Sequence, residues 1–355
     1  MSVKVGVLGG GGSIGLELIG FLSRHVPDVQ VLAMGRTAKS CSRVSERFGG
    51  DVPTKILDCR DLSALREVLY DCDLFCNCAG PSALYSAPVA WASLQAGVPY
   101  ADPSDSLSLR TVFEKAERLG CMISAIYGAG LVPGLSGILP MWFAQEAHKE
   151  TNQWEGLDVY YAGKDEFSDS AAFDYADSIR TAMPPEPGIA KPHFVEMPCA
   201  GQTFLAFAHT SEEIRCIRSQ IGIPLAYHNC FIGEEMLQAL ATVRSKKEDA
   251  LSLDDAAKNL KEASRQCAAL YGHGHSFLCR AKDADGQTSG WAVTVSEANA
   301  LMGAMMGLAS RHLLYKEISG AHYFAEILPA GNVVAELTKQ GYLQMTASTE
   351  VRNQP

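Results

Sequence analysis

Short apolar runs alternate with amphipathic stretches through the first third of the chain. Val3–Leu8 is rich in β-branched residues and predicts a buried strand, while Ile14–Ser23 carries apolar residues at helical spacing. Further strands are predicted over Val29–Met34, Lys55–Leu57, Leu74–Cys78, Val98–Ala101 and Cys121–Tyr127. Helical patterns lie between them, one starting at Ser86 and ending at Gly97. This alternation predicts the α/β fold class, with a doubly wound parallel sheet covered on both faces.

The pattern changes in the middle of the chain, where strand and helix candidates no longer alternate strictly. Strands are predicted over Leu157–Ala162, Gln202–Thr210, His275–Ala281 and Thr288–Val295, the last two as a hairpin around Asp283–Gly286. Helices are predicted over Glu234–Arg244 and Asp254–Leu270, and a loop over Pro184–Pro187. These elements predict a second, α+β domain for substrate binding and dimerisation.

The end of the chain carries an apolar helix from Glu297 to about Leu314, followed by a tail of polar character. We expect this helix to pack back on the first domain. The predicted organisation is therefore a dinucleotide-binding domain over residues 1–130, joined by the segment 297–355, and a substrate domain over residues 131–296.

A glycine-rich turn follows the first strand. The run GVLGGGGSIG contains a Gly-x-Gly-x-x-Gly frame at Gly10, Gly12 and Gly15, with Ser13 and Ile14 before the last glycine. Between a strand and a helix this frame is the Rossmann fingerprint, in which the glycines let the backbone approach a pyrophosphate at the helix N-terminus. The frame gives Gly9 and Gly11 no special role and predicts dinucleotide binding.

The end of the second strand indicates which dinucleotide is bound. An NAD enzyme usually has an acidic residue here for the ribose hydroxyls, whereas this chain has Gly35, Arg36 and Thr37. Arginine can pair with a 2′-phosphate and stack on adenine, and the threonine hydroxyl can add a hydrogen bond. We therefore expect NADP(H) as the cofactor, although a solvated surface arginine is the simpler interpretation of Arg36.

Two further motifs carry a resemblance to a known family. The run CNCAGPSALYSAPVAWASLQAGVPYADPSD, which includes Asn77, and the run GAGLVPGLSG at Gly128–Gly137 resemble the short form of the saccharopine dehydrogenase-like NADP-dependent oxidoreductases. The resemblance implies that Ala79, Gly80 and Pro81 lie along the nicotinamide, that Asp58 lies near adenine, and that Asp102 and Gly128 border the cleft. Saccharopine-forming members carry an extra helical insertion, whereas shorter relatives reduce other double bonds.

Four side chains are candidates for contact with the substrate. Lys164 follows a predicted strand and could bind a carboxylate or donate a proton, Tyr127 ends the sixth strand, and His228 could act as an acid near neutral pH. Asp102 joins them through the resemblance. The competing interpretations are a surface lysine, a core tyrosine and a structural histidine.

Two other patterns resemble known sites but do not have the geometry or spacing that those sites require. The Tyr160-x-x-x-Lys164 spacing matches the short-chain dehydrogenase pair, but that pair needs a helix and this stretch is strand-like. Cysteines near residue 76, with His273 and His275, fit no common zinc spacing, so we expect no metal.

Composition narrows the class of partner. A net charge of −10 and a pI of about 5.4 argue against nucleic acid and anionic membrane surfaces. The uncharged stretch between Arg118 and Glu146 is broken by glycines and prolines, so we expect no membrane span. Eleven cysteines without regular spacing, and an apolar start that runs into the glycine turn, predict reduced thiols in a cytoplasmic protein.

The expected function is an NADPH-dependent reductase that transfers a hydride to the imine of a small amino-acid-derived or specialised metabolite. One alternative is a thiazoline or ene reductase acting on a carrier-bound, siderophore-type intermediate. The other is a regulator that senses NADP without turnover. The exposed face of the second domain's sheet is expected to pair in a homodimer.

Overall fold

The computed structural model describes residues 2–150, 154–182, 191–198, 200–244, 251–284 and 288–348. The chain divides into two compact units, which are described separately. Unit 1 comprises Met1–Leu135 and Asn299–Leu328, and unit 2 comprises Ser136–Ala298 and Pro329–Pro355. Both units are therefore built from two separate stretches of the chain.

Unit 1 is built on a seven-stranded sheet in the order β13-β6-β5-β4-β1-β2-β3, in which every pair of neighbouring strands is parallel. The strands are β1 Val3–Leu8, β2 Val29–Gly35, β3 Thr54–Ile56, β4 Leu74–Asn77, β5 Tyr100–Ala101, β6 Ala125–Tyr127 and β13 Ala321–Tyr323. The strand order reverses between β1 and β4, so the carboxyl ends of these two strands form the topological switch point where ligands bind in such sheets.

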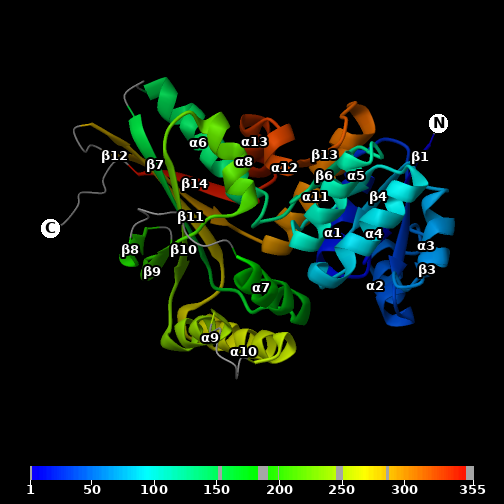
Figure 1. The fold of residues 1–355 in the computed structure, drawn as a ribbon, viewed down its shortest axis with the longest axis horizontal. Helices are drawn as coiled ribbons and strands as arrows, with labels where there is room; N and C mark the ends of the chain where they lie inside the picture. Colours follow the sequence, from blue (N-terminus) through cyan, green and yellow to red (C-terminus); the bar gives the residue numbers. More distant parts are fainter. Residues whose placement is uncertain are drawn as a thin grey trace. The chain divides into compact units, whose positions relative to one another are not determined.

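Helices connect the strands of unit 1 (Figure 1, blue to cyan, with α11 and α12 in orange). They are α1 Ser13–His25, α2 Ala38–Phe48, α3 Leu62–Leu69, α4 Ser82–Ala96, α5 Leu107–Arg118, α11 Ala298–Tyr315 and α12 Phe324–Ile327. The parallel sheet with its connecting helices confirms the predicted fold class.

Glycines allow α11 to pack closely on α1. A Cβ atom at Gly303 would overlap Glu17, and one at Gly307 would overlap the ring of Phe21. Both residues of α1 lie one turn apart, as do the two glycines, so the helices meet along matched faces. This packing, together with the pairing of β13 with β6, joins residues 299–328 to unit 1.

Unit 2 is built on a mixed seven-stranded sheet in the order β14-β12-β11-β7-β10-β9-β8. Its strands are β7 Trp154–Gly163, β8 His193–Met197, β9 Gln202–Ala208, β10 Leu225–Phe231, β11 His275–Asp283, β12 Thr288–Val295 and β14 Leu343–Ser348. Only β7 and β10 pair in parallel; the other neighbours are antiparallel. The predicted α+β character of this region is therefore present.

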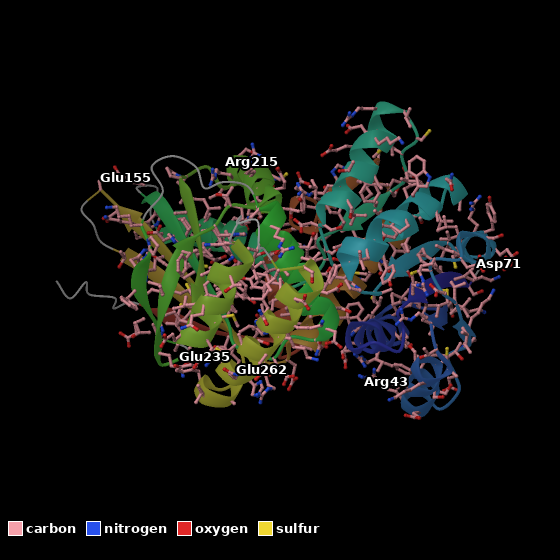
Figure 2. The ribbon with its side chains drawn as sticks, turned by 60° about the horizontal axis from the view of Figure 1, so that its bottom comes forward. Arg43, Asp71, Glu155, Arg215, Glu235 and Glu262 are labelled. Carbon is pink, nitrogen blue, oxygen red and sulfur yellow. The ribbon has the colours of Figure 1, made fainter. Side chains whose placement is uncertain are left out.

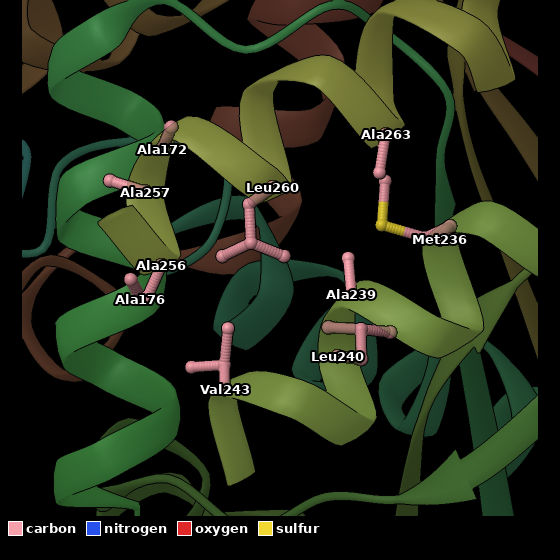
Figure 3. Close-up of a cluster of buried hydrophobic side chains, with 10 residues drawn as sticks. All are labelled: Ala172, Ala176, Met236, Ala239, Leu240, Val243, Ala256, Ala257, Leu260 and Ala263. Atoms are coloured by element: carbon pink, nitrogen blue, oxygen red, sulfur yellow. The ribbon is translucent and has the colours of Figure 1, made fainter. Parts of the chain in front are cut away.

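The helices of unit 2 are α6 Leu135–Glu150, α7 Asp169–Thr181, α8 Glu212–Ile221, α9 Glu234–Arg244, α10 Leu253–Tyr271 and α13 Ala330–Lys339. Helices α7, α9 and α10 bury a small apolar core of their own, in which Leu260 lies among Ala176, Leu240 and Val243 (Figure 3). A second core lies on the sheet and includes Tyr160, Phe204 and Leu278.

The structure corrects two predictions made from the sequence. Residues 329–355 belong to unit 2, not to the first domain, because α13 buries Val333 and Leu337 and β14 pairs with β12. Helix α4 begins at Ser82 rather than Ser86, and Pro88 lies inside it. The predicted loop Pro184–Pro187 and most of the turn Asp283–Gly286 lie outside the described residues.

Charged side chains cover the outside of both units. Asp71, Glu155, Glu235 and Glu262 are exposed and project outward, with Arg43 and Arg215 among them (Figure 2). Within the described part of the chain, no helix combines the length and the apolar character that crossing a bilayer requires.

Candidate functional site

The turn after β1 lies against the loop after β4. Gly9 has a φ of +76°, and a Cβ atom there would lie 2.5 Å from the carbonyl oxygen of Cys78. The amide of Cys78 in turn donates to the carbonyl of Leu8 over 2.8 Å. Gly9 is therefore required both by its backbone conformation and by this close approach, which corrects the prediction that it has no special role.

The three glycines of the fingerprint follow in order. Gly10 donates its amide to Met34 over 3.0 Å, which ties the turn to the end of β2, and Gly12 donates to Gly9 over 2.8 Å. A Cβ atom at Gly15 would overlap the carbonyl of Gly9. The turn closes tightly on itself, so side chains are excluded from its inner surface.

Gly11 packs the turn against the second helix. A Cβ atom at Gly11 would overlap the backbone of Ser40, and one at Gly35 would overlap the Ser40 hydroxyl. The start of α2 thus rests directly on both turns. The structure assigns Gly11 a packing role that the motif alone did not predict.

The N-terminus of α1 offers unused amide groups. Gly12 is its N-cap residue, makes no side-chain cap, and the first turn contains no acidic residue. Ser13 is exposed and Ile14 is half-buried. Because the first amides of a helix have no partners inside the helix, this end fits the pyrophosphate of a dinucleotide.

Arg36 and Thr37 lie at the end of β2. Arg36 is exposed and is close enough to Asp58 to contribute to lowering its pKa. The main cause is Arg60, whose guanidinium donates to the Asp58 carboxylate over 2.6 Å and helps hold that pKa at about 2. Thr37 is the N-cap of α2, where its hydroxyl accepts from the amide of Ser40 over 3.2 Å. The neighbourhood offers an exposed guanidinium and an ionised carboxylate.

A buried polar network supports the loop Asn77–Pro81. Asp102 is 1% exposed, and its Oδ2 accepts from Tyr100 over 2.5 Å and from Asn77 Nδ2 over 2.8 Å. Its Oδ1 accepts from the amide of Ser104 over 2.9 Å, while Asn77 Oδ1 accepts from the amide of Ala79 over 3.1 Å. Burial raises the pKa of Asp102. The network therefore holds the loops after β4 and β5 in fixed positions.

Ala79, Gly80 and Pro81 follow Asn77, and the Gly80–Pro81 peptide is cis. Pro81 is the N-cap of α4, so this helix starts directly after the loop. The Ser86 side chain of α4 accepts from Asn77 Nδ2 over 3.2 Å. A residue predicted as a helix cap is thus part of the buried network.

Tyr127 is the last residue of β6 and is 9% exposed. Its ring stacks on Phe113 at 5.5 Å and contacts Tyr323 at 4.5 Å between ring centroids. The ring is fixed by aromatic packing from α5 and β13.

The other two catalytic candidates are in unit 2. The Lys164 ammonium donates to Gln202 Oε1 and to the carbonyl of Tyr271, both over 2.9 Å. His228 is 2% exposed and stacks on Tyr160 at 4.7 Å. His228 lies opposite Tyr160 where β10 pairs with β7. Tyr160 precedes Lys164 by four residues, which is about 13 Å along an extended strand. The structure does not bring Lys164 and His228 together.

A hydrogen-bonded chain that the sequence analysis missed ends at a pocket of about 610 Å³ in unit 2, which Asp165 and His275 line. Tyr161 OH lies 2.9 Å from His275 Nδ1, and His275 Nε2 lies 2.9 Å from Asp165 Oδ2. Asp165 follows β7 and His275 begins β11, and the two strands pair with His275 opposite Gly163. The HGH sequence at residues 273–275 is the signal in the sequence that points to this chain. Among the described residues, no group of three or more His, Cys, Asp or Glu is placed to hold a metal ion.

A parallel sheet with a glycine turn at its switch point defines a Rossmann-type dinucleotide-binding unit. Residues 5–158 match the family model described as the saccharopine dehydrogenase NADP binding domain, so this stretch of the chain is an NADP-binding domain of the saccharopine dehydrogenase type. The resemblance stated from the sequence is thereby confirmed.

Solved structures share the fold. Apo saccharopine dehydrogenase (L-Glu forming) from Saccharomyces cerevisiae aligns with a TM-score of 0.65 at 17% identity, over 98% of this chain and 100% of that one. A dehydrogenase from Chromobacterium violaceum aligns with a TM-score of 0.50 at 11% identity, over 96% of this chain and 97% of that one. A sequence comparison with curated proteins finds no match.

Proposed function

We propose that this protein is an NADPH-dependent reductase that acts on the imine of a small amino-acid-derived or specialised metabolite. NADPH supplies the hydride, which adds to the imine carbon while the nitrogen takes a proton, so that a C=N bond becomes an amine and NADP⁺ is formed. The chain's own groups bind the two reactants, orient them and exclude water.

One observation carries the proposal: the bare N-terminus of α1 lies beside the loop after β4. The approach of Gly9 to Cys78 brings the phosphate-binding turn and the Ala79–Pro81 loop to the same switch point. A dinucleotide with its pyrophosphate on α1 would extend along this loop. The rigid support from Asn77 and Asp102 suits a surface that must hold a nicotinamide in one orientation.

Arg36 favours NADPH over NADH in this proposal. It is exposed at the end of β2, where the ribose of a bound dinucleotide is expected, and a guanidinium pairs well with a 2′-phosphate. The negative charge of Asp58 is paired with Arg60, so the carboxylate does not compete fully for Arg36.

The four candidate catalytic residues take different roles. Asp102 acts as a positioning residue, because its carboxylate is buried and already accepts three hydrogen bonds. Tyr127 is a rigid ring at the carboxyl end of β6, two strands from β4, with its hydroxyl as a candidate proton donor. Lys164 and His228 remain candidates for substrate contact from unit 2, with the Lys164 ammonium already engaged by two acceptors.

A fluorescence titration with NADPH and NADH, followed by a screen of imine acceptors, tests the proposal. Micromolar NADPH binding with at least a roughly tenfold preference, about 1.4 kcal/mol, and oxidation of NADPH by an imine would support it. Binding without turnover on any acceptor would favour a regulator. Turnover only when the substrate is attached to a carrier protein would favour the thiazoline or ene reductase.

The cellular setting and the assembly are also proposals. The ten cysteines in the described part of the chain are all free thiols, which supports a reducing compartment such as the cytoplasm. A homodimer formed through the sheet of unit 2 is tested by measuring the mass of the protein in solution.

A further inference from the structure

The pocket in unit 2 has an unusual balance of charge. Its lining includes the carboxylates of Asp165, Glu166 and Glu297, the imidazoles of His273 and His275, and the amide of Gln344. No lysine or arginine is among the described lining residues. Lys164 is adjacent in sequence, but its ammonium is held by Gln202 and Tyr271. The pocket therefore presents acceptors rather than fixed positive charge.

The hydrogen-bonded chain fixes the state of Asp165. A carboxylate accepts only, so His275 Nε2 carries the hydrogen that it donates to Asp165. In the neutral imidazole, His275 Nδ1 then accepts from the Tyr161 hydroxyl. Burial raises the pKa of Tyr161, so this hydroxyl keeps its proton. The amide of Gly274 donates to the second Asp165 oxygen over 2.8 Å. The carboxylate is thus held ionised and in one orientation.

Asp165 is nevertheless accessible from the pocket. Its side chain is 36% exposed, whereas that of His275 is 12% exposed. The hydrogen bond from His275 is the main cause that lowers the pKa of Asp165 to about 2. An ionised, partly exposed carboxylate supported from behind is an arrangement that binds a cation.

We propose that this pocket binds a protonated amine, the cationic end of the substrate, with Asp165 as its direct partner and His275 and Tyr161 as positioning residues. This inference rests on the proposed function, because it names the substrate class of that reductase. An organic cation is favoured over a metal ion, since no metal-ligating group is assembled among the described residues. A volume of about 610 Å³ suits a small organic ligand.

One feature of the pocket opposes a cation. Ala298, the first residue of α11, is in the lining, and the N-terminal end of a helix carries partial positive charge. Glu297 precedes it directly and offsets this charge. Because an anion would gain from the helix end, the test must compare a cation, an anion and a neutral molecule of the same shape.

The test is a titration of the full-length protein with n-butylamine, n-butanol and butyrate near neutral pH, in which binding is measured by NMR or calorimetry. We expect n-butylamine to bind at least about tenfold more tightly than the other two. Equal or tighter binding of butyrate or butanol would overturn the proposal. So would a divalent ion, tested as Mg²⁺ and Zn²⁺, that binds through Asp165 and excludes the amine.

Variants distinguish the loss of the contact between Asp165 and the amine from a loss of the fold. Asp165→Asn should weaken n-butylamine binding about tenfold, whereas the matched change Asp169→Asn, at a surface carboxylate paired with Lys261, should leave it unchanged. If Asp165→Asn disturbs folding, Glu297→Gln provides the second test. Glu297 is exposed, so its loss should weaken binding about threefold without unfolding the protein. Unchanged binding in folded Asp165→Asn or Glu297→Gln would contradict the assignment.

A pH profile tests the positioning role of His275. The ionisable groups facing Asp165 are His275 and His273, with Glu166 and Glu297 on the pocket wall. Removing the His275 hydrogen bond raises the pKa of Asp165 from about 2 toward its ordinary value. As the pH is lowered, amine binding by His275→Ala should therefore disappear at a higher pH than in the unmodified protein. His275→Gln should restore part of this difference in pH. An unshifted profile would remove His275 from the assignment.

Failure of this inference can be distinguished from failure of the proposed function. If NADPH reduces imines but n-butylamine does not bind, only the amine pocket is wrong. If n-butylamine binds through Asp165 but NADPH does not bind, the reductase is wrong and the pocket assignment stands.

Discussion

The glycine turn of unit 1 and the amine pocket of unit 2 are built in opposite ways. The turn is made of backbone, and its residues are close together in the sequence between Gly9 and Gly15. The pocket is made of side chains that strand pairing brings together from the loop after β7, from β11 and β12, and from the start of β14. A site made of backbone leaves a local pattern of glycines, whereas a site made of side chains leaves none. Substitutions should therefore damage the first through shape and the second through charge.

The largest effect is expected at Gly9. In Gly9→Ala, the methyl group would meet the Cys78 carbonyl at 2.5 Å and the backbone would keep its positive φ. Overpacking and the left-handed conformation together should cost about 3 kcal/mol and abolish NADPH binding. Urea unfolding and the NADPH titration measure both effects.

Gly97→Ala is the matched control for Gly9→Ala. Gly97 also has a positive φ, of 70°, but nothing lies within 4 Å of its Cβ position. It should lose only about 1 kcal/mol, the conformational part, and keep NADPH binding. Equal losses in the two variants would show that crowding at Cys78 is not what makes Gly9 necessary.

The difference between the two regions also explains what could be predicted from the sequence. The strand Val3–Leu8 was predicted correctly because its signal, an apolar run, is local, and the glycine spacing marks the turn after this strand in the same local way. Ser86 was predicted as a helix cap because capping has a local pattern, but its place beside Asn77 depends on a distant strand. The pattern does not predict strand β14, because Leu343 and Met345 alternate with polar residues over too short a length.

The residues of the pocket in unit 2 show the same difference between local and non-local signals. Nothing local joins Tyr161, Asp165 and His275, since the last is more than a hundred residues away and reaches them only through the pairing of β11 with β7. The sequence instead drew attention to Lys164, because a charged residue at a strand end is conspicuous. The structure shows that its ammonium is already held by Gln202 and Tyr271.

Asp102→Asn should have the second-largest effect, because it breaks the buried side-chain network that holds the loops after β4 and β5. An amide would place a donor against Tyr100 or Asn77, which both donate to the carboxylate. We expect a loss of about 2 kcal/mol in the free energy of unfolding. Urea unfolding of the variant and of the unmodified protein near neutral pH measures it.

The difference in the free energy of unfolding between the unmodified protein and Asp102→Asn should depend on pH with a definite sign. Burial raises the folded-state pKa of Asp102 above its ordinary value, so the folded state holds the proton more tightly than the unfolded state. The associated stability is present below that ordinary value and is lost as the pH rises through the folded-state pKa. Asp58 and Asp165, with lowered pKa values, act in the opposite direction, so the comparison must subtract the Asp102→Asn variant. A pH-independent difference would contradict this account.

Arg36→Ala should have a moderate effect, confined to the choice of cofactor. Removing the guanidinium should lower the ratio of NADPH to NADH affinity about tenfold, or about 1.4 kcal/mol, and leave stability unchanged because Arg36 is exposed. Arg43→Ala, at another exposed arginine further along α2, is the control (Figure 2). If both variants change the ratio equally, general positive charge rather than Arg36 selects NADPH.

The smallest effect is expected for Tyr161→Phe, which tests the far end of the hydrogen-bonded chain in unit 2. The ring and its packing on Phe277 are kept, and only the hydroxyl that donates to His275 Nδ1 is lost. We expect a loss of about 1 kcal/mol in stability and a change of about threefold in n-butylamine affinity, because Asp165 still receives the His275 N–H. Tyr70→Phe, at an exposed tyrosine of unit 1, should change neither quantity. If Tyr161→Phe weakens amine binding as strongly as Asp165→Asn, the hydroxyl does more than hold the imidazole, and Tyr161 would have to be assigned a direct part in forming the charged pocket.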